Sequence, residues 1–257
     1  GIQLGKAFGC RIKVLSIVDI RIFEWAVVMG TEGFVPMIPS NAYRDESKKI
    51  LESKADAVLE KCSSMLSKEN LDFETEKIQG PPADIILEKS PLVDLLVMGA
   101  RGEFAKWKSN TLGATVDVIA RQWNKPIFIT PKKFREMSKI LFAYDGSERS
   151  NKGLQLAGLL ATELGIPIVI LTVHDREVIR KKLLKEASIY LEPYEVPTEL
   201  VGVSGNPERE ICTIAEEKHC NLIIMGAFGH SRIRERILGS TTEQIIRNTN
   251  MPILLSK

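Results

Sequence analysis

The sequence has little of what marks several common classes of protein. Its formal net charge is only +2, which gives no sign of a surface for nucleic acid or membrane. No apolar run approaches the roughly 20 residues of a membrane-spanning helix, and the first residues show no signal-peptide pattern. The cysteines have no CxxC spacing, and three histidines are too few for the usual metal-ligand patterns, so no metal site is assigned. We therefore expect a cytoplasmic protein with reduced thiols at Cys10, Cys62, Cys212 and Cys220.

What the sequence does contain is an internal repeat. Segments from the first half resemble segments from the second: Val14–Asp19 and Val169–Asp175, Gly80–Asp84 and Gly205–Arg209, Leu95–Gly102 and Leu222–Gly229, Lys125–Ile129 and Met251–Leu255. Because the copies lie more than a hundred residues apart, each copy is the size of a domain and not of a solenoid unit. The repeat predicts a first domain at residues 1–131 and a second at 137–257, joined by a linker at 131–136.

The second repeat predicts a regular alternation of strands and helices. The expected strands are Lys139–Tyr144, Ile168–Val173, Thr198–Val203, Leu222–Met225 and Ile253–Leu255. Between them we expect four helices: one from a cap at Ser147 to Leu164 and ended by Gly165, one at Glu177–Tyr190, one at Pro207–Lys218, and one around Glu243–Arg247. This alternation predicts a parallel sheet covered on both faces, with ligands at the carboxyl ends of the strands.

The first repeat begins later in its pattern than the second. Gly9 aligns with Gly165, so Gly1 falls within the first helix, and the sequence contains no counterpart of residues 139–156. The remaining expected elements are strands Ile12–Val18, Phe73–Ile78, Leu95–Met98 and Ile127–Ile129, with helices Tyr43–Leu66, Ala83–Glu88 and Ala114–Gln122. An apolar insertion at residues 20–40 either forms an interface or folds onto its own domain.

A glycine-rich stretch from Asn221 to Thr242 is the strongest functional signal. A buried apolar strand leads into Gly226 and Gly229, and Gly239 then precedes an amphipathic helix. Glycines allow the backbone to approach a ligand closely, and a helix N-terminus attracts phosphate. Ser240 and Thr241 are expected to cap this helix and to donate hydroxyl groups to phosphate oxygens. The spacing matches neither the Walker nor the Rossmann fingerprint, and an ordinary strand-to-helix turn is the alternative.

Together with the tandem layout and with Asp145 after the first strand, this stretch resembles the universal stress protein family. The resemblance implies two tandem Rossmann-like (HUP-type) α/β domains, each a five-stranded parallel sheet of order 3-2-1-4-5, the first without its first strand in this sequence. It also implies ATP or AMP as ligand, with or without Mg²⁺. It places Asp145 beside the adenosine and the backbone of Val173 against the adenine. The other expected binding residues are Met225, Gly226, Gly229, His230, Gly239, Ser240 and Thr241.

Several of these residues also have a simpler interpretation. A carboxylate before Gly146-Ser147, such as that of Asp145, often only stabilises a turn. His230 and the basic side chains at Arg232, Arg234 and Arg236 either neutralise phosphate charge or form a solvated face. Cys212 and Cys220 are interpreted as core or partly buried thiols, not as nucleophiles.

The first repeat departs from the glycine pattern. Ten residues, not nine, separate Gly102 from Gly113, and Ala114 stands where the second repeat has Ser240, with Thr115 one place on. We therefore expect one nucleotide per chain, held by the second repeat.

The sequence favours a regulatory nucleotide-binding protein over an enzyme. No general base beside a nucleophile stands out, and no Walker-type lysine is present. The alternatives are a weak nucleotide hydrolase and a ligand-free dimerising scaffold of the same fold. Strands Ile127–Ile129 and Ile253–Leu255 are short, apolar edges that are expected to pair and so form an intramolecular pseudo-dimer, which leaves a further homodimer open.

Overall fold

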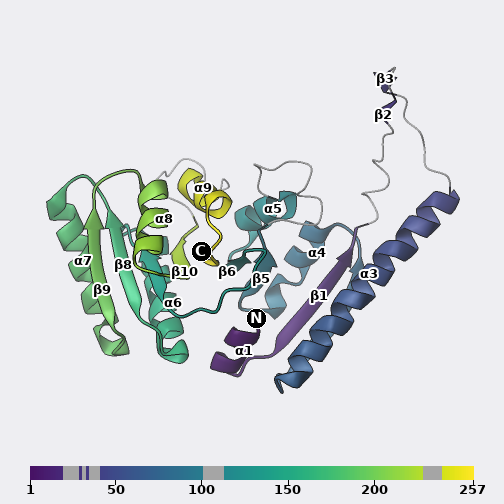
Figure 1. The fold of residues 1–257 in the computed structure, drawn as a ribbon, viewed down its shortest axis with the longest axis horizontal. Helices are drawn as coiled ribbons and strands as arrows, with labels where there is room; N and C mark the ends of the chain where they lie inside the picture. Colours follow the sequence, from purple (N-terminus) through teal and green to yellow (C-terminus); the bar gives the residue numbers. More distant parts are fainter. Residues whose placement is uncertain (20–28, 31–32, 35–40, 101–112, 228–238) are drawn as a thin grey trace. The chain divides into compact units, whose positions relative to one another are not determined.

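The described part of the chain forms two compact units. The computed structural model describes residues 1–19, 29–30, 33–34, 41–100, 113–227 and 239–257. The first unit is Gly1–Lys89 and the second is Ser90–Lys257 (Figure 1).

A seven-stranded sheet forms the centre of the second unit. Its strands lie in the order β5 (Leu96–Gly99), β6 (Ile127–Thr130), β11 (Ile253–Ser256), β10 (Leu222–Gly226), β7 (Ile140–Ala143), β8 (Ile168–Val173) and β9 (Thr198–Val203). The central strands are continuous apolar runs, and Ile140, Ile168 and Ile223 are fully buried. Such runs are typical of strands that are covered on both faces.

The second repeat has the expected topology. Read from the edge, β9, β8, β7, β10 and β11 are parallel neighbours, which is the order 3-2-1-4-5. Helices α6 (Glu148–Leu164) and α7 (Glu177–Leu191) pack together on the sheet, as do α8 (Pro207–Glu217) and α9 (Ser240–Asn248) (Figure 1). Ser147 caps α6, as predicted, because its Oγ accepts a hydrogen bond from the Ser150 N–H at 3.2 Å.

The last strands of the two repeats pair within this unit. β6 and β11 are antiparallel, with Ile129 opposite Ile253 and Phe128 opposite Leu254. This confirms the predicted pairing of the two edges. Helix α5 (Ala114–Gln122) precedes β6 and has the predicted bounds.

The compact units do not coincide with the repeats. Strands β5 and β6 belong to the first repeat by sequence, yet they lie in the second unit because β6 pairs with β11. Among the described residues, the other two strands of the first repeat, β1 (Ile12–Val18) and β4 (Phe73–Gln79), form a parallel sheet of their own. The described strands of the first repeat are therefore divided between the two units. The boundaries at 131 and 137 stay a prediction about the repeat.

The first unit contains a small α/β layer. Helix α3 (Asn41–Lys68) packs on β1 and β4, while α4 (Pro82–Glu88) contacts β1. Helix α1 (Ile2–Phe8) ends at Gly9, whose left-handed φ of 57° matches the φ of 64° at Gly165 after α6. Within the insertion, Met29–Gly30 (β2) and Gly33–Phe34 (β3) pair antiparallel. The two interpretations of the insertion concern mainly residues outside the described ranges.

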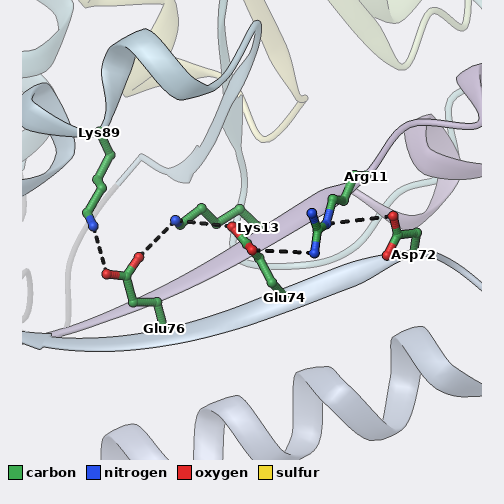
Figure 2. A network of polar contacts seen from close by, with 6 residues as sticks. All are labelled: Arg11, Lys13, Asp72, Glu74, Glu76 and Lys89. Atoms are coloured by element: carbon green, nitrogen blue, oxygen red, sulfur yellow. Dashed lines mark hydrogen bonds and ion pairs between the residues drawn. The ribbon is translucent and has the colours of Figure 1, made fainter.

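A ladder of charged side chains crosses the β1–β4 sheet (Figure 2). Lys13 lies between two carboxylates, with its Nζ 3.1 Å from Glu74 Oε1 and 2.9 Å from Glu76 Oε2. The ladder continues at one end to Lys89, whose Nζ is 2.7 Å from Glu76 Oε1, and at the other to Arg11 and Asp72. Three cations and three anions alternate, so the ladder is neutral.

None of the helices in the described residues combines the length and the apolar character needed to cross a bilayer.

Candidate functional site

The carboxyl ends of three neighbouring strands meet at one edge of the second unit. β8, β7 and β10 are adjacent and parallel, and they end at Val173, Ala143 and Gly226. Along the chain, β8 is followed by α7, β7 by α6, and β10 by α9. In open parallel sheets, such an edge is where ligands bind when the connections diverge.

A cavity of about 300 Å³ opens at this edge. It contains five of the predicted residues, Asp145, Val173, Met225, Gly226 and Thr241. The rest of its lining is mostly apolar, with polar groups on Tyr144, His174 and Thr242: the remaining lining residues are Ala143, Tyr144, Leu171, His174, Leu183, Pro207, Ile211 and Thr242. An apolar cavity with a few converging polar groups is the usual form of a small-molecule site.

The other predicted residues lie beside the cavity or outside the described ranges. Gly239 and Ser240 begin α9, next to the lining residue Thr241. Gly229, His230 and the basic residues at 232, 234 and 236 fall in residues 228–238, which are not described. A larger groove of about 420 Å³, which includes Arg135, Asn221 and Asn250, lies before the amino ends of the strands and contains no predicted site residue.

Asp145 has the turn role that the sequence offered as its simpler interpretation. Its Oδ1 accepts a hydrogen bond from the Ser147 N–H at 3.0 Å. Gly146 between them has φ of 74°, and a Cβ there would lie 2.6 Å from Leu183 Cδ2, so glycine is strongly favoured at this position. The turn holds the Asp145 carboxylate at the cavity wall, and the turn role does not exclude contact with a ligand.

The backbone of Val173 is open toward the cavity. Pairing of β8 with β7 ends at Leu171, whereas pairing with β9 continues to Val173. The Leu171 carbonyl accepts from the Tyr144 N–H at 2.9 Å on the β7 side. Since backbone groups two residues apart in a strand point the same way, the N–H and C=O of Val173 also point to the β7 side, beyond the last β7 pair.

Helix α9 is capped one residue before Ser240, the first of its hydroxyl side chains. Its N-cap is Gly239, without a side-chain cap bond, so the predicted caps at Ser240 and Thr241 are wrong. The first intrahelical bond runs from the Glu243 N–H to the Gly239 carbonyl at 2.9 Å. Helix geometry therefore leaves the N–H groups of residues 240–242 as donors at the N-terminus. Ser240 is exposed and remains placed for a ligand role, not a capping role.

Thr242 is a residue that the sequence analysis missed. It is 1% exposed, and its Oγ1 donates to the carbonyls of Gly226 (3.4 Å) and Ala227 (3.3 Å), which ties the start of α9 to the end of β10. The signal was present, because Thr242 lies three and four residues before the buried Ile245 and Ile246 and so belongs to the inner face of the helix.

The cavity also contains polar groups that the sequence gave no reason to select. Tyr144 donates from its hydroxyl to Asn151 Oδ1 at 2.7 Å, and burial raises its pKa, so the hydroxyl stays neutral. His174 follows β8 directly and lines the cavity. Tyr144 and His174 line the cavity through tertiary contacts, and these contacts produce no motif in the sequence.

The structure agrees with the interpretation of the two cysteines, since Cys220 is buried and Cys212 is half-buried. Burial raises the pKa of Cys220 to about 11 and raises that of Cys212 as well. A raised pKa leaves little thiolate at neutral pH, which makes these residues poor nucleophiles. Within the described ranges, no group of three or more His, Cys, Asp or Glu side chains is arranged to hold a metal ion.

Comparison with known proteins identifies the family. The profile of the Universal stress protein family matches residues 136–257. Universal stress protein Slr1230 of Synechocystis is 31% identical over 263 residues, covering 98% of this chain and 91% of that protein. The chain belongs to the universal stress protein family. Universal stress protein MJ0577 of Methanocaldococcus jannaschii is 32% identical over 133 residues, covering 49% of this chain and 80% of that protein.

A solved structure supports the fold across the whole chain. A universal stress protein from Archaeoglobus fulgidus superposes with a TM-score of 0.75 at 22% identity, covering 100% of this chain and 89% of that one. At this identity the likeness shows that the chain has the α/β fold of a universal stress protein.

Proposed function

We propose that the cavity of the second repeat binds an adenine nucleotide, ATP or AMP, and that the protein serves as a nucleotide-responsive regulator in the cytoplasm. The observation that supports this best is the open backbone of Val173. Its C=O can accept from the exocyclic amino group of adenine, and its N–H can donate to the adjacent ring nitrogen. Guanine presents a carbonyl in place of that amino group and would leave the Val173 carbonyl unpaired.

The other end of the cavity suits phosphate. Across β7 from Val173 lie Gly226 and the first turn of α9, with its free N–H donors and the hydroxyl groups of Ser240 and Thr241. A helix N-terminus carries a partial positive charge that favours an anion. If the base lies at β8 and the phosphates lie at α9, the ribose between them would be near Asp145. The Asp145 carboxylate can accept hydrogen bonds from the sugar hydroxyls.

The proposal does not include efficient hydrolysis. Among the described lining residues, Asp145 supplies the one carboxylate, and it already accepts from the Ser147 N–H. A Mg²⁺ ion bound with ATP would be carried by the phosphate oxygens. The nucleotide would then act by biasing conformation or assembly.

Isothermal titration of the purified chain with ATP, AMP and GTP tests the proposal, together with mass spectrometry of any ligand released on denaturation. We expect ATP or AMP to bind, and GTP to bind at least tenfold more weakly, the effect of leaving one buried acceptor unpaired. An empty protein that binds none of the three would favour the ligand-free scaffold. Appearance of ADP or AMP from ATP on the timescale of the titration would favour the hydrolase.

A further inference from the structure

His174 stands on a fixed backbone at the β8 end of the cavity. Its N–H donates to the Val203 carbonyl at 3.0 Å, which continues the β8–β9 pairing, and its carbonyl accepts from the Arg180 guanidinium. The side chain is half-buried and lines the cavity next to Val173. The position of the imidazole is therefore set by strand pairing and not by a free loop.

A hydrogen bond to the backbone also sets the tautomer of the ring. His174 Nδ1 accepts from the Arg176 N–H at 3.0 Å. A nitrogen that accepts carries no proton, so in the neutral imidazole the proton is on Nε2. The ring thus offers one fixed donor, Nε2–H, from the wall of the cavity.

Few other side chains at this end of the cavity compete for a ligand's acceptor atoms. Leu171, Pro207 and Ile211 are apolar, while Thr241 and Thr242 lie on α9 at the other end. A purine whose amino edge meets the backbone of Val173 keeps two further ring acceptors, N3 and N7, away from that edge. A donor beside Val173 can therefore read one of them.

We propose that His174 is a specificity-determining residue that donates from Nε2 to N3 or N7 of the bound purine. This rests on the proposed function, because it requires a purine in the cavity. The His174 contact would add a side-chain hydrogen bond to a base that otherwise bonds only to the backbone of Val173. It would also link the bound base to the start of α7 (Figure 1), because His174 accepts from the N–H of Arg176, the N-cap of that helix.

Two substitutions separate the donor from the turn. In H174N the side-chain oxygen can still accept from the Arg176 N–H, as Asp145 accepts from the N–H of Ser147 two residues on, but no donor reaches the Nε2 position. In H174Q the amide extends to that position and restores a donor. Both keep a polar side chain, and their thermal unfolding should match that of the wild type.

The experiment measures the dissociation constants of ATP, 3-deaza-ATP and 7-deaza-ATP by isothermal titration for the three proteins. In the wild type we expect one of the two deaza analogues to bind about 2- to 12-fold more weakly than ATP, the effect of one neutral hydrogen bond. H174N should bind ATP more weakly by a similar factor and should no longer distinguish that analogue. H174Q should recover part of both effects.

Two results would overturn the inference while leaving the proposed function in place. One is a wild type that binds ATP and both deaza analogues equally well. The other is an H174N protein that keeps the wild-type discrimination, which would mean that another group contacts the ring nitrogen. A wild type that binds neither ATP nor AMP would overturn both the inference and the proposed function.

Discussion

Gly113 and Gly239 hold the same backbone conformation at the same place in the two repeats. Gly113 begins α5 with φ −60° and ψ 135°, and Gly239 begins α9 with φ −58° and ψ 140°. Neither φ lies in the left-handed region, so neither position requires glycine for its conformation. Under the proposed function, glycine at 239 would allow close approach of a phosphate. A substitution at Gly239 tests this, and the same substitution at Gly113 is its control.

Replacing Gly239 with Val should abolish nucleotide binding without unfolding the protein. The backbone angles suit any residue, so the added side chain acts by its bulk at the helix N-terminus. Isothermal titration measures the affinity, and circular dichroism reports the fold. G113V is the matched control and should leave ATP affinity unchanged. Unchanged affinity in G239V would contradict the phosphate site at α9.

We expect one nucleotide per chain. The first turn of α5 has Ala114 where α9 has Ser240, which removes a hydroxyl that could bond a charged phosphate, a loss of roughly 1.5–3 kcal/mol. The longer spacing before Gly113 should weaken a site there further. Titration with ATP measures the stoichiometry. A value near two that falls to half in G239V would show that the first repeat binds as well.

Removing the Thr242 hydroxyl should lower stability more than removing the Ser240 hydroxyl. T242V leaves the half-buried carbonyl of Gly226 and the buried carbonyl of Ala227 without this donor, and should cost about 1 kcal/mol. S240A should change stability by less than about 0.5 kcal/mol, because Ser240 is exposed and makes no cap bond. Urea unfolding measures both. Equal losses of stability in the two variants would mean that the Thr242 hydroxyl does not anchor the start of α9 to the end of β10.

Lys257 should make stability rise with pH on the alkaline side. Burial, and then the charge of Arg149, lower its pKa from 10.5 to about 8, so between these values the unfolded chain binds more protons than the folded one. The stability of the wild type relative to K257M should therefore increase from pH 7.5 to pH 9.5, by about 1–2 kcal/mol. Parallel urea titrations at several pH values test this. A difference that is constant with pH would contradict the lowered pKa.

The strands were predictable because the residues at their two ends mark where each strand begins and stops. β8 and β9 have the predicted bounds, since each follows a proline and ends at a polar turn. The order 3-2-1-4-5, in contrast, came from the family resemblance, because strand order depends on contacts that periodicity does not encode. The division into compact units could not be predicted either. It depends on two sets of contacts, the pairing of β6 with β11 and the contacts of β5 with the rest of the first repeat, and on which set is stronger.

The sequence identified some residues of the candidate cavity and missed others. Glycines and a helix start point to phosphate, and five predicted residues do line one cavity. The predicted N-caps, Ser240 and Thr241, lie one and two residues too late, because both are good caps in isolation, whereas the inward-facing Thr242 fixes the phase of α9. His174 was missed because its fixed tautomer results from a bond to the Arg176 N–H, which only the folded turn creates.

The charged ladder of the first unit bears on how a chain with two similar halves folds correctly. Lys13 is the second residue of β1 and lies opposite Glu74, just as Val169 is the second residue of β8 and lies opposite Glu199. Val169 is fully buried, while the carboxylates of Glu76 and Glu74 raise the pKa of Lys13 and keep it charged. If β1 took the place of β8 during folding, a lysine would be buried in an apolar layer, at a cost of several kcal/mol. The ladder therefore discourages exchange of strands between the repeats, a misfolding route to which tandem domains are especially prone.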